Sequence, residues 1–255
     1  MSRTVSPRSS FLLAVAVFVP LVAAPIVTRH DTDDAAHREL AERFPSLVHL
    51  NLPDGEAVLI RPEWVLTAAH VAVEVEPGDT LTLAGGDVEV SRVFVHPDWD
   101  DGPADIALLR LSRPAVQVQP VDVYRERDEA GQLIYLVGAG YGGSGLTGPD
   151  GVLGELRAAT NRIDEASDHW LKFRFDDPRE EGSAATDLEG ISGPGDSGGP
   201  AYVERDGVQF VVGVSSGQST GATGGVEGVY GVTEYYTRVS SYLEWIEATI
   251  GGTEP

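Results

Sequence analysis

One short stretch of this chain could do covalent chemistry: Gly195-Asp196-Ser197-Gly198-Gly199-Pro200. It places a serine among glycines, with an acid immediately before the serine. Glycine lets the backbone approach a ligand closely and adopt angles that other residues cannot. A serine hydroxyl is a weak nucleophile until a neighbouring base takes its proton. The stretch therefore requires a histidine base, and a carboxylate to orient that histidine, elsewhere in the chain.

Two upstream segments supply these groups. His70 follows the apolar, strand-like run Trp64–Ala69, whose small last residues leave room for a second side chain and a substrate. Asp105 stands at the head of another apolar run, Ile106–Leu111. A buried acid in such a place can hold a histidine in one tautomer and stabilise its cation. We therefore expect Ser197 to attack a carbonyl, His70 to take its proton and Asp105 to orient His70.

Other serine hydrolase arrangements fit the sequence less well. The nucleophile elbow of α/β-hydrolases needs its histidine after the serine, whereas the last of the six histidines is His169. A subtilisin-like order needs an aspartate before His70. The run Asp31–Asp34 offers one, but the glycines around Ser197 and the apolar strand after Asp105 argue against that order.

Two further motifs are interpreted as structural. The run Gly138–Gly143 matches a dinucleotide-binding fingerprint. That fingerprint must open a helix, whereas the next residues, 144–151, are rich in turn formers. Asp98, Asp100 and Asp101 form an acidic loop whose spacing is not that of a calcium-binding loop. The sequence therefore predicts neither a metal nor a cofactor.

Three motifs together resemble the trypsin/chymotrypsin-like serine protease family. They are Thr67-Ala68-Ala69-His70, Asp105-Ile106-Ala107-Leu108-Leu109 and the hexapeptide around Ser197, in the family's order of histidine, aspartate and serine. The resemblance implies an all-β fold with two six-stranded antiparallel β-barrels of the chymotrypsin type and a C-terminal helix. It also implies an active site in the crevice between the barrels, where the backbone N–H groups of Gly195 and Ser197 form the oxyanion hole.

The chain divides into three segments by composition. Residues 1–25 are interpreted as a secretory signal, 26–43 as a lead-in or propeptide, and 44–255 as the protease domain, with barrels at 44–125 and 126–240. Short strand-like runs with turn signals recur through both halves, which is typical of barrels. The pattern Ser241-x-x-Glu244 predicts a capping box for the final helix. Cysteine is absent, so packed strands must stabilise the domain without disulfides.

The first residues have the composition of an export signal. Arg3 and Arg8 give a positive start, and Phe11–Ala24 is apolar but too short for an ordinary membrane-spanning helix. We therefore expect a secreted or periplasmic protein without stable membrane association after signal removal. The net charge of −22 makes nucleic acid and anionic membranes poor partners. The expected partner is a polypeptide substrate, and a monomer is expected.

The resemblance also places a specificity pocket. Trypsins carry an aspartate six residues before the nucleophile, where this chain has Ile191. Ser215 and Gly217 match the segment that pairs with the substrate backbone, and Gly217 leaves the pocket mouth open. Glu234 aligns with the pocket wall, where it admits a basic or polarised aromatic side chain unless the loop 220–233 shifts it into solvent. We expect an apolar or mixed preference.

Asp196 is the residue whose usual partner is not evident in the sequence. In the family a new N-terminus, Ile-Val-Gly-Gly, pairs with the acid before the serine. The nearest sequence here is Ile26-Val27-Thr28-Arg29. Either cleavage before Ile26 supplies an amine for Asp196, or other donors hold Asp196 and no activation step exists. A catalytically silent, protease-like binding protein and an esterase using the same site are the alternative functions.

Overall fold

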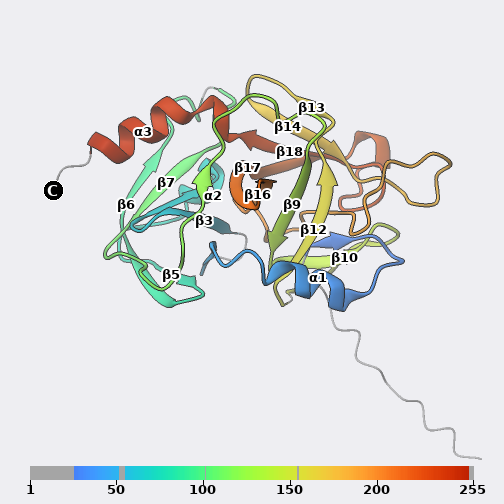
Figure 1. Ribbon diagram of the computed structural model, residues 1–255, viewed down its shortest axis with the longest axis horizontal. Helices are drawn as coiled ribbons and strands as arrows, with labels where there is room; N and C mark the ends of the chain where they lie inside the picture. The colour runs from blue at the N-terminus through green and yellow to red at the C-terminus, as the bar shows by residue number, and fades with distance from the viewer. Residues whose placement is uncertain (1–25, 52–54, 101, 154, 253–255) are drawn as a thin grey trace, which may run out of the picture.

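The computed structural model describes residues 26–51, 55–100, 102–153 and 155–252. These residues form two β units that lie side by side, and a helix ends the described chain (Figure 1). The segment interpreted as an export signal, residues 1–25, lies outside the described residues. Among the residues described, no helix has the length and apolar character needed to cross a membrane.

The first unit is a closed barrel of six antiparallel strands in the order β2-β3-β4-β7-β6-β5. Apolar side chains from its strands, such as Val58, Leu66 and Leu109, are fully buried in the core. The two apolar runs that flank the expected site are strands β4 and β7 of this barrel. The strands are β2 (Leu47–Leu50), β3 (Glu56–Arg61), β4 (Trp64–Thr67), β5 (Thr80–Leu83), β6 (Gly86–Val95) and β7 (Ala107–Leu111).

The second unit is an eight-stranded sheet that curls on itself. Its strands follow the order β12-β9-β16-β17-β18-β14-β13, with β8 beside β17. Asn161 of β12 donates its side-chain amide to the carbonyl of Arg174 on β14 at 3.1 Å, which joins strands far apart in that order. The strands are β8 (Asp122–Val123), β9 (Leu133–Gly138), β12 (Arg157–Arg162), β13 (Glu165–Ala166), β14 (Trp170–Arg174), β16 (Pro200–Arg205), β17 (Val208–Ser219) and β18 (Thr233–Arg238). The expected all-β architecture of two barrel-like units is confirmed.

A small sheet inserts the start of the described chain into the second unit. Strand β1 pairs in parallel with β10 and antiparallel with β15, and β11 completes the sheet beside β10. Ile26, which precedes β1, is fully buried, as is Val27. The four strands are β1 (Val27–Thr28), β10 (Tyr141–Ser144), β11 (Gly148–Leu153) and β15 (Gly190–Ile191). The helix α1 (Asp34–Ala41) follows β1 and lies over β12 (Figure 1).

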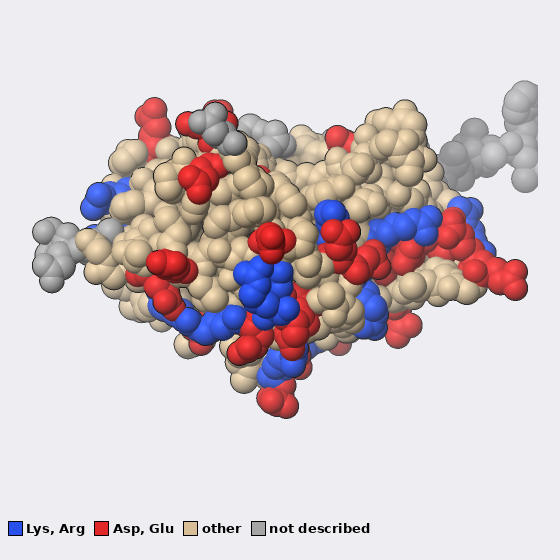
Figure 2. All heavy atoms as spheres, turned by 90° about the horizontal axis from the view of Figure 1, so that it is seen from above, with Lys and Arg blue, Asp and Glu red and all other residues tan. Residues whose placement is uncertain are grey.

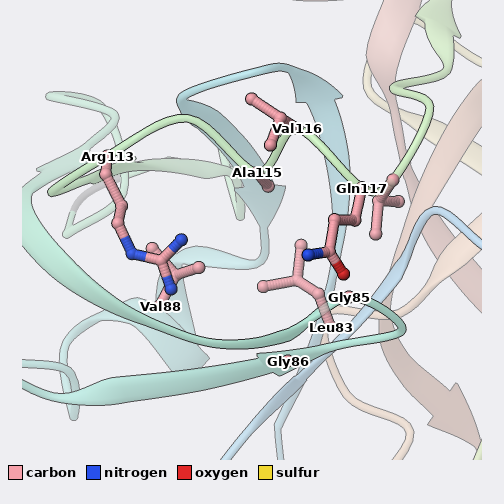
Figure 3. Close-up of a pocket in the computed structure, with 9 residues that line it drawn as sticks. Leu83, Gly85, Gly86, Val88, Arg113, Ala115, Val116 and Gln117 are labelled. Atoms are coloured by element: carbon pink, nitrogen blue, oxygen red, sulfur yellow. The ribbon is translucent and has the colours of Figure 1, made fainter.

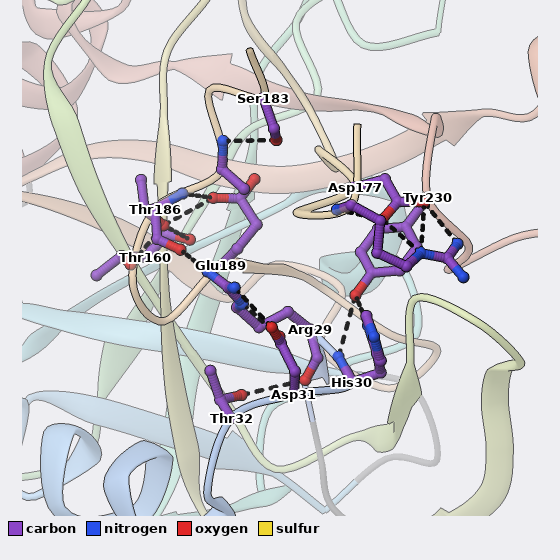
Figure 4. A network of polar contacts seen from close by, with 12 residues as sticks. Arg29, His30, Asp31, Thr32, Thr160, Asp177, Ser183, Thr186, Glu189 and Tyr230 are labelled. Carbon is purple, nitrogen blue, oxygen red and sulfur yellow. Dashed lines mark hydrogen bonds and ion pairs between the residues drawn. The ribbon is translucent and has the colours of Figure 1, made fainter. Parts of the chain in front are cut away.

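A polar network fixes the segment that follows β1 (Figure 4). The guanidinium of Arg29 donates to the Thr186 carbonyl at 2.7 Å, and the Tyr230 hydroxyl accepts the N–H of His30 at 3.0 Å. Glu189 is buried and accepts both the N–H and the hydroxyl of Thr186, each at 2.7 Å. Burial raises the pKa of Glu189 to about 7. Neutral and charged donors together therefore hold this segment against the second unit.

The C-terminal helix α3 (Leu243–Gly252) packs back on the first unit (Figure 1). Ile246 belongs to the apolar cluster that contains the core of the first barrel. Among the described residues, no hydrogen bond joins Ser241 to Glu244, so the expected capping box is not formed; the Ser241 hydroxyl donates to the Asp168 carbonyl. A short 3-10 turn, Val239–Ser241, precedes the helix.

A small pocket lies at one end of the first barrel (Figure 3). None of the residues that line it belongs to the motifs of His70, Asp105 or Ser197. The turn between β5 and β6 and the segment after β7 line it, with Leu83, Val88 and Val118 among its residues. Arg113, which also lines it, donates to the Asp87 carbonyl at 2.7 Å. The Arg113 guanidinium at this pocket is therefore already hydrogen-bonded to the backbone of the barrel.

Surface charges are mixed rather than segregated on the face shown in Figure 2. Basic side chains lie beside acidic ones, and a broad uncharged area separates the charged groups. Ion pairs such as Arg61–Asp122 and Arg205–Asp128 show the same mixing. The described part of this face therefore has no continuous basic surface of the kind that binds nucleic acid.

Candidate functional site

Two hydrogen bonds join Asp105 to His70 at the edge of the first barrel. His70 lies in the short helix α2 (Ala69–Ala72) after β4, and Asp105 stands just before β7. These strands are antiparallel neighbours with Thr67 opposite Ala107, which brings the two residues together. Asp105 Oδ2 lies 2.8 Å from His70 Nδ1, and Asp105 Oδ1 accepts the backbone N–H of His70 at 2.9 Å. This contact places the proton on Nδ1 and leaves Nε2 able to accept one.

The second unit adds two hydroxyl groups to this corner. Ser216 on β17 donates to Asp105 Oδ2 at 2.5 Å. Thr237 on β18 donates to the Asp105 carbonyl at 2.7 Å. Sequence analysis gives neither residue a role at Asp105, although Ser216 lies within the segment 215–217 that is expected to pair with the substrate backbone. Asp105 is thus held by donors from both units.

Ser197 reaches the same corner through the glycine that follows it. Gly198 has a φ of +77°, and a Cβ there would clash with Thr67 Oγ1 and stand 3.2 Å from the Ala68 nitrogen. These two residues lie directly before the helix that carries His70. Only glycine permits both the positive φ and the close approach. The turn that carries the expected nucleophile therefore packs against the residues just before the expected base, although no hydrogen bond joins Ser197 to His70 among the described residues.

The peptide between Pro194 and Gly195 is oriented by Tyr141. The Tyr141 N–H donates to the Pro194 carbonyl at 2.6 Å. In a trans peptide the next N–H points the opposite way, so the Gly195 N–H is directed away from Tyr141. Within the described part of the chain, neither this N–H nor that of Ser197 has an acceptor. Two unpaired N–H groups beside a nucleophile are what an oxyanion hole requires.

Asp196 is buried and accepts two backbone hydrogen bonds. Its Oδ1 accepts the Gly140 N–H at 2.7 Å, and its Oδ2 accepts the Gly193 N–H at 2.8 Å. A second buried carboxyl, Glu56, lies beside it and accepts the Ala139 N–H at 2.6 Å. Burial and the neighbouring Glu56 raise the pKa of Asp196 well above its usual range. Sequence analysis missed Glu56, and the only signal was an acid at the start of an otherwise apolar strand.

Glu234 is buried, so the loop 220–233 does not shift it into solvent. Its carboxylate accepts the N–H of Ser192 at 2.9 Å and also the Ser192 hydroxyl. That hydroxyl lies 3.3 Å from the hydroxyl of Ser215. Burial raises the pKa of Glu234 to about 8. Gly217 lies nearby on the strand of Ser215 and is exposed, with nothing within 4 Å of a Cβ position.

Ile191 lies in the core beside the start of the chain. It pairs with Val27 across β1 and β15 and shares an apolar cluster with Ile26. Gln218, which sequence analysis missed, donates its amide to the Ser192 carbonyl at 2.8 Å. Glu234 and Gln218 both hydrogen-bond to Ser192, the chain neighbour of Ile191, and the acid among the residues expected to form the pocket comes from β18 rather than from position 191.

Comparison with known proteins places this site in a family. The family model described as Trypsin matches residues 35–246. The chain belongs to the trypsin family. It is 33% identical over 221 residues to vitamin K-dependent protein C of Rattus norvegicus, a match covering 76% of this chain and 45% of that protein. It is 28% identical over 243 residues to the complement C1s subcomponent of Sus scrofa, a match covering 82% of this chain and 34% of that protein.

The matched region of this trypsin-family member contains all three motifs. His70, Asp105 and Ser197 lie within the residues that the family model covers, whereas Ile26 lies before them. The chain spans less than half the length of the curated relatives described above. Its own residues must therefore carry the argument for its activity.

Proposed function

We propose that this trypsin-family member is a serine endopeptidase that cleaves peptide bonds through an acyl-enzyme intermediate. The convergence of Asp105, His70 and Ser197 at the junction of the two units carries the proposal. His70 Nε2 takes the proton as Ser197 Oγ attacks the carbonyl carbon, and Asp105 stabilises the resulting imidazolium. His70 then protonates the leaving amine. Water attacks the acyl group in a second, equivalent step that restores Ser197.

The oxyanion formed in each step binds between the N–H groups of Gly195 and Ser197. Each such donor contributes about 3 to 4 kcal/mol to transition-state binding in enzymes of this kind. The free N–H of Gly195 supports this role, because Tyr141 already fixes the preceding carbonyl. No movement of this peptide is then required when the oxyanion forms.

The side chain on the acyl side of the cleaved bond is expected to enter the pocket formed by Ile191, Ser215, Gly217 and Glu234. Glu234 with a pKa of about 8 is mostly protonated at neutral pH, so the pocket is then uncharged. A lysine or arginine side chain would have to drive the ionisation of Glu234. The proposed preference is therefore apolar or mixed near neutral pH, and it becomes more basic as pH rises.

Asp196 is the residue that an amine on Ile26 would meet if the chain were cut before that residue. The burial of Ile26 and the pairing of Val27 with Ile191 support this route. N-terminal sequencing of the active protein tests it, and a start at any other residue removes it. Export is part of the same proposal, and a signal-dependent appearance of the protein outside the cytoplasm would support it.

A serine-directed fluorophosphonate probe tests the proposed chemistry. We expect the full chain to be labelled and to cleave peptides, and Ser197→Ala to lose both properties while remaining folded. Ser219→Ala, an exposed serine on β17, is the matched control. Peptide cleavage by Ser197→Ala would refute the assignment. Labelling with ester cleavage alone would indicate an esterase, and no labelling would indicate a silent binding protein.

A further inference from the structure

Two buried carboxyl groups meet behind the turn that carries Ser197. A Cβ atom on Gly138 would clash with Asp196 Oδ1 and would stand 3.0 Å from Glu56 Oε2, so both oxygens border one point. Glu56 is 2% exposed and Asp196 is 1% exposed. The Glu56 N–H also donates to the Ser197 carbonyl at 2.7 Å. Glu56 thus contacts the nucleophile turn through both its backbone and its side chain.

The hydrogen bonds of the pair leave one oxygen without a partner. Asp196 accepts N–H groups on both oxygens, and Glu56 accepts the Ala139 N–H on Oε1. Among the described residues, Glu56 Oε2 is the buried side-chain atom that has no partner. Two adjacent carboxylates in a dry interior cannot both be ionised without a large penalty. The pair must therefore hold a proton, and Oε2 is the atom free to carry it.

We propose that Glu56 is a positioning residue that shares one proton with Asp196. The Glu56 carboxylic acid donates from Oε2 to Asp196 Oδ1, and this contact holds the Asp196–Ser197 turn with the oxyanion hole open. The turn is then held by donors within the chain, which is the alternative to the route through an amine on Ile26. The catalytic consequence rests on the proposed peptidase function, whereas the shared proton itself does not.

The titratable groups around the pair act on its proton in opposite directions: His49 lowers the pKa of Glu56, whereas Glu234 raises the pKa of Asp196. His49 on β2 lies 3.4 Å from Glu56 Oε1, which is longer than a good N–H···O bond, and it is partly exposed. Tyr202 on β16 is buried and bonds to the Ser46 hydroxyl at 3.0 Å. On β18, Glu234 and Tyr236 lie near enough to Asp196 to act on its charge. Of these groups only His49 can supply a positive charge.

The direction of the pH effect follows from this environment. Burial raises the pKa of Glu56, and burial together with Glu56 raises the pKa of Asp196. Such a pair titrates as a unit, so it keeps its proton to higher pH than an ordinary carboxyl does and loses it as pH rises further. Its loss would set two charges side by side and displace Asp196. Because the Ser197 N–H acts mainly in the transition state, kcat would fall more than KM would change.

Glu56→Gln tests the shared proton directly in the full chain. The glutamine oxygen can accept the Ala139 N–H, and its amide nitrogen can donate to Asp196 at every pH. We expect kcat to stay within about threefold of the wild type near neutral pH, a change under 1 kcal/mol. We also expect the alkaline fall in kcat caused by the pair to disappear. His49→Gln is the control and should keep that fall, moved to higher pH, since the proton is placed on Glu56 and His49 lowers the pKa of Glu56.

A ¹³C NMR titration of side-chain carboxyl carbons separates the pair from the chemistry. The titration needs no turnover, so it can be recorded on Ser197→Ala. There we expect one carboxyl of the pair to remain protonated through neutral pH. Ordinary carboxyl titration of both groups would overturn the proposal. An unchanged alkaline profile in Glu56→Gln, or loss of the fall in His49→Gln, would also overturn it. If the wild type is inactive but one carboxyl of the pair stays protonated as expected, only the proposed peptidase function is refuted.

Discussion

The Ser216 hydroxyl donates to Asp105 Oδ2 at 2.5 Å, and the same oxygen lies 2.8 Å from His70 Nδ1. Ser216 belongs to the second unit, whereas Asp105 and His70 belong to the first. Two donors on one oxygen fix the direction of the carboxylate and hence the plane of the imidazole. The geometry of the proposed base therefore depends on how the two units dock.

Replacing Ser216 by alanine should lower kcat with little change in KM. A hydrogen bond to a charged group contributes about 1.5 to 3 kcal/mol, and each 1.4 kcal/mol is roughly tenfold in rate. We expect about a tenfold loss of kcat, because Asp105 keeps its two bonds to His70. Ser219→Ala on the same strand is the control. Equal kcat values for wild type and Ser216→Ala, from steady-state kinetics on one peptide, would contradict this role.

The elements that position the candidate residues were predictable from the sequence. His70 and Asp105 adjoin apolar runs that form β4 and β7, and Ser197 lies in a glycine-rich stretch with its own signature. Each pattern reflects a requirement met within a few residues: a buried strand, or a backbone that only glycine permits. The order of the three motifs then indicated the architecture, which the fold confirms.

The contacts that connect distant segments were not predictable. Ser216 meets Asp105 across 111 positions of sequence, and nothing near either residue indicates the contact. The burial of Glu234 depends on how β18 lies against Ser192. The sequence alone was therefore compatible with either a buried or an exposed Glu234. Glu56 stands just before an apolar run, but only the fold shows that Asp196 lies beside it. Such contacts arise from tertiary packing rather than from local preference.

Gly198→Ala should destabilise the fold well beyond the cost of its backbone angle. Gly198 and Gly207 share a φ of +77°, but a Cβ at 198 would clash with Thr67, whereas nothing lies within 4 Å at 207. Gly207→Ala should cost about 1 to 2 kcal/mol through backbone strain alone. The added overlap at 198 should cost about 1 to 3 kcal/mol more. Urea unfolding of both variants measures the difference, and equal losses would show that the close approach is not needed.

Glu129→Gln should unfold the protein more easily, because it breaks a buried ion pair. Arg238 donates to both oxygens of Glu129, at 3.0 and 2.5 Å, and both side chains are almost fully buried. Removing one partner leaves a buried charge, which costs about 3 to 5 kcal/mol. Glu165→Gln, which removes the exposed partner of Lys172, should change stability little. Comparable losses from the two variants in chemical denaturation would contradict the prediction.

The same pair predicts a loss of stability in acid. Burial opposes ionisation of Glu129, but hydrogen bonds from Arg238 and Ser240 lower its pKa overall. A carboxyl with a lowered folded-state pKa stabilises the fold above its unfolded pKa, and that contribution is lost as pH falls through the folded value. Glu129→Gln should therefore lose less stability than the wild type on acidification below pH 4.5, the ordinary value of the group.

Glu234 should make both stability and substrate preference depend on pH. Its pKa is raised by burial from 4.5 to about 8. A raised carboxyl pKa means that the folded state holds a proton that the unfolded state has released, so stability falls as pH rises between these values. Each pKa unit corresponds to about 1.4 kcal/mol. In Glu234→Gln the free energy of unfolding should fall less steeply with pH between these values. Urea unfolding across that pH range measures the difference.

The ionisation of Glu234 should also change which peptides are cleaved. Below pH 8 the proposed pocket is mostly uncharged, whereas above it the Glu234 carboxylate would pair with lysine or arginine. The ratio of kcat/KM for an arginine peptide to that for a matched tyrosine peptide should therefore rise through about pH 8 and then level off. In Glu234→Gln the ratio should stay flat, and effects of His70 ionisation cancel because both substrates share that step. A ratio independent of pH in the wild type would place Glu234 outside the substrate pocket.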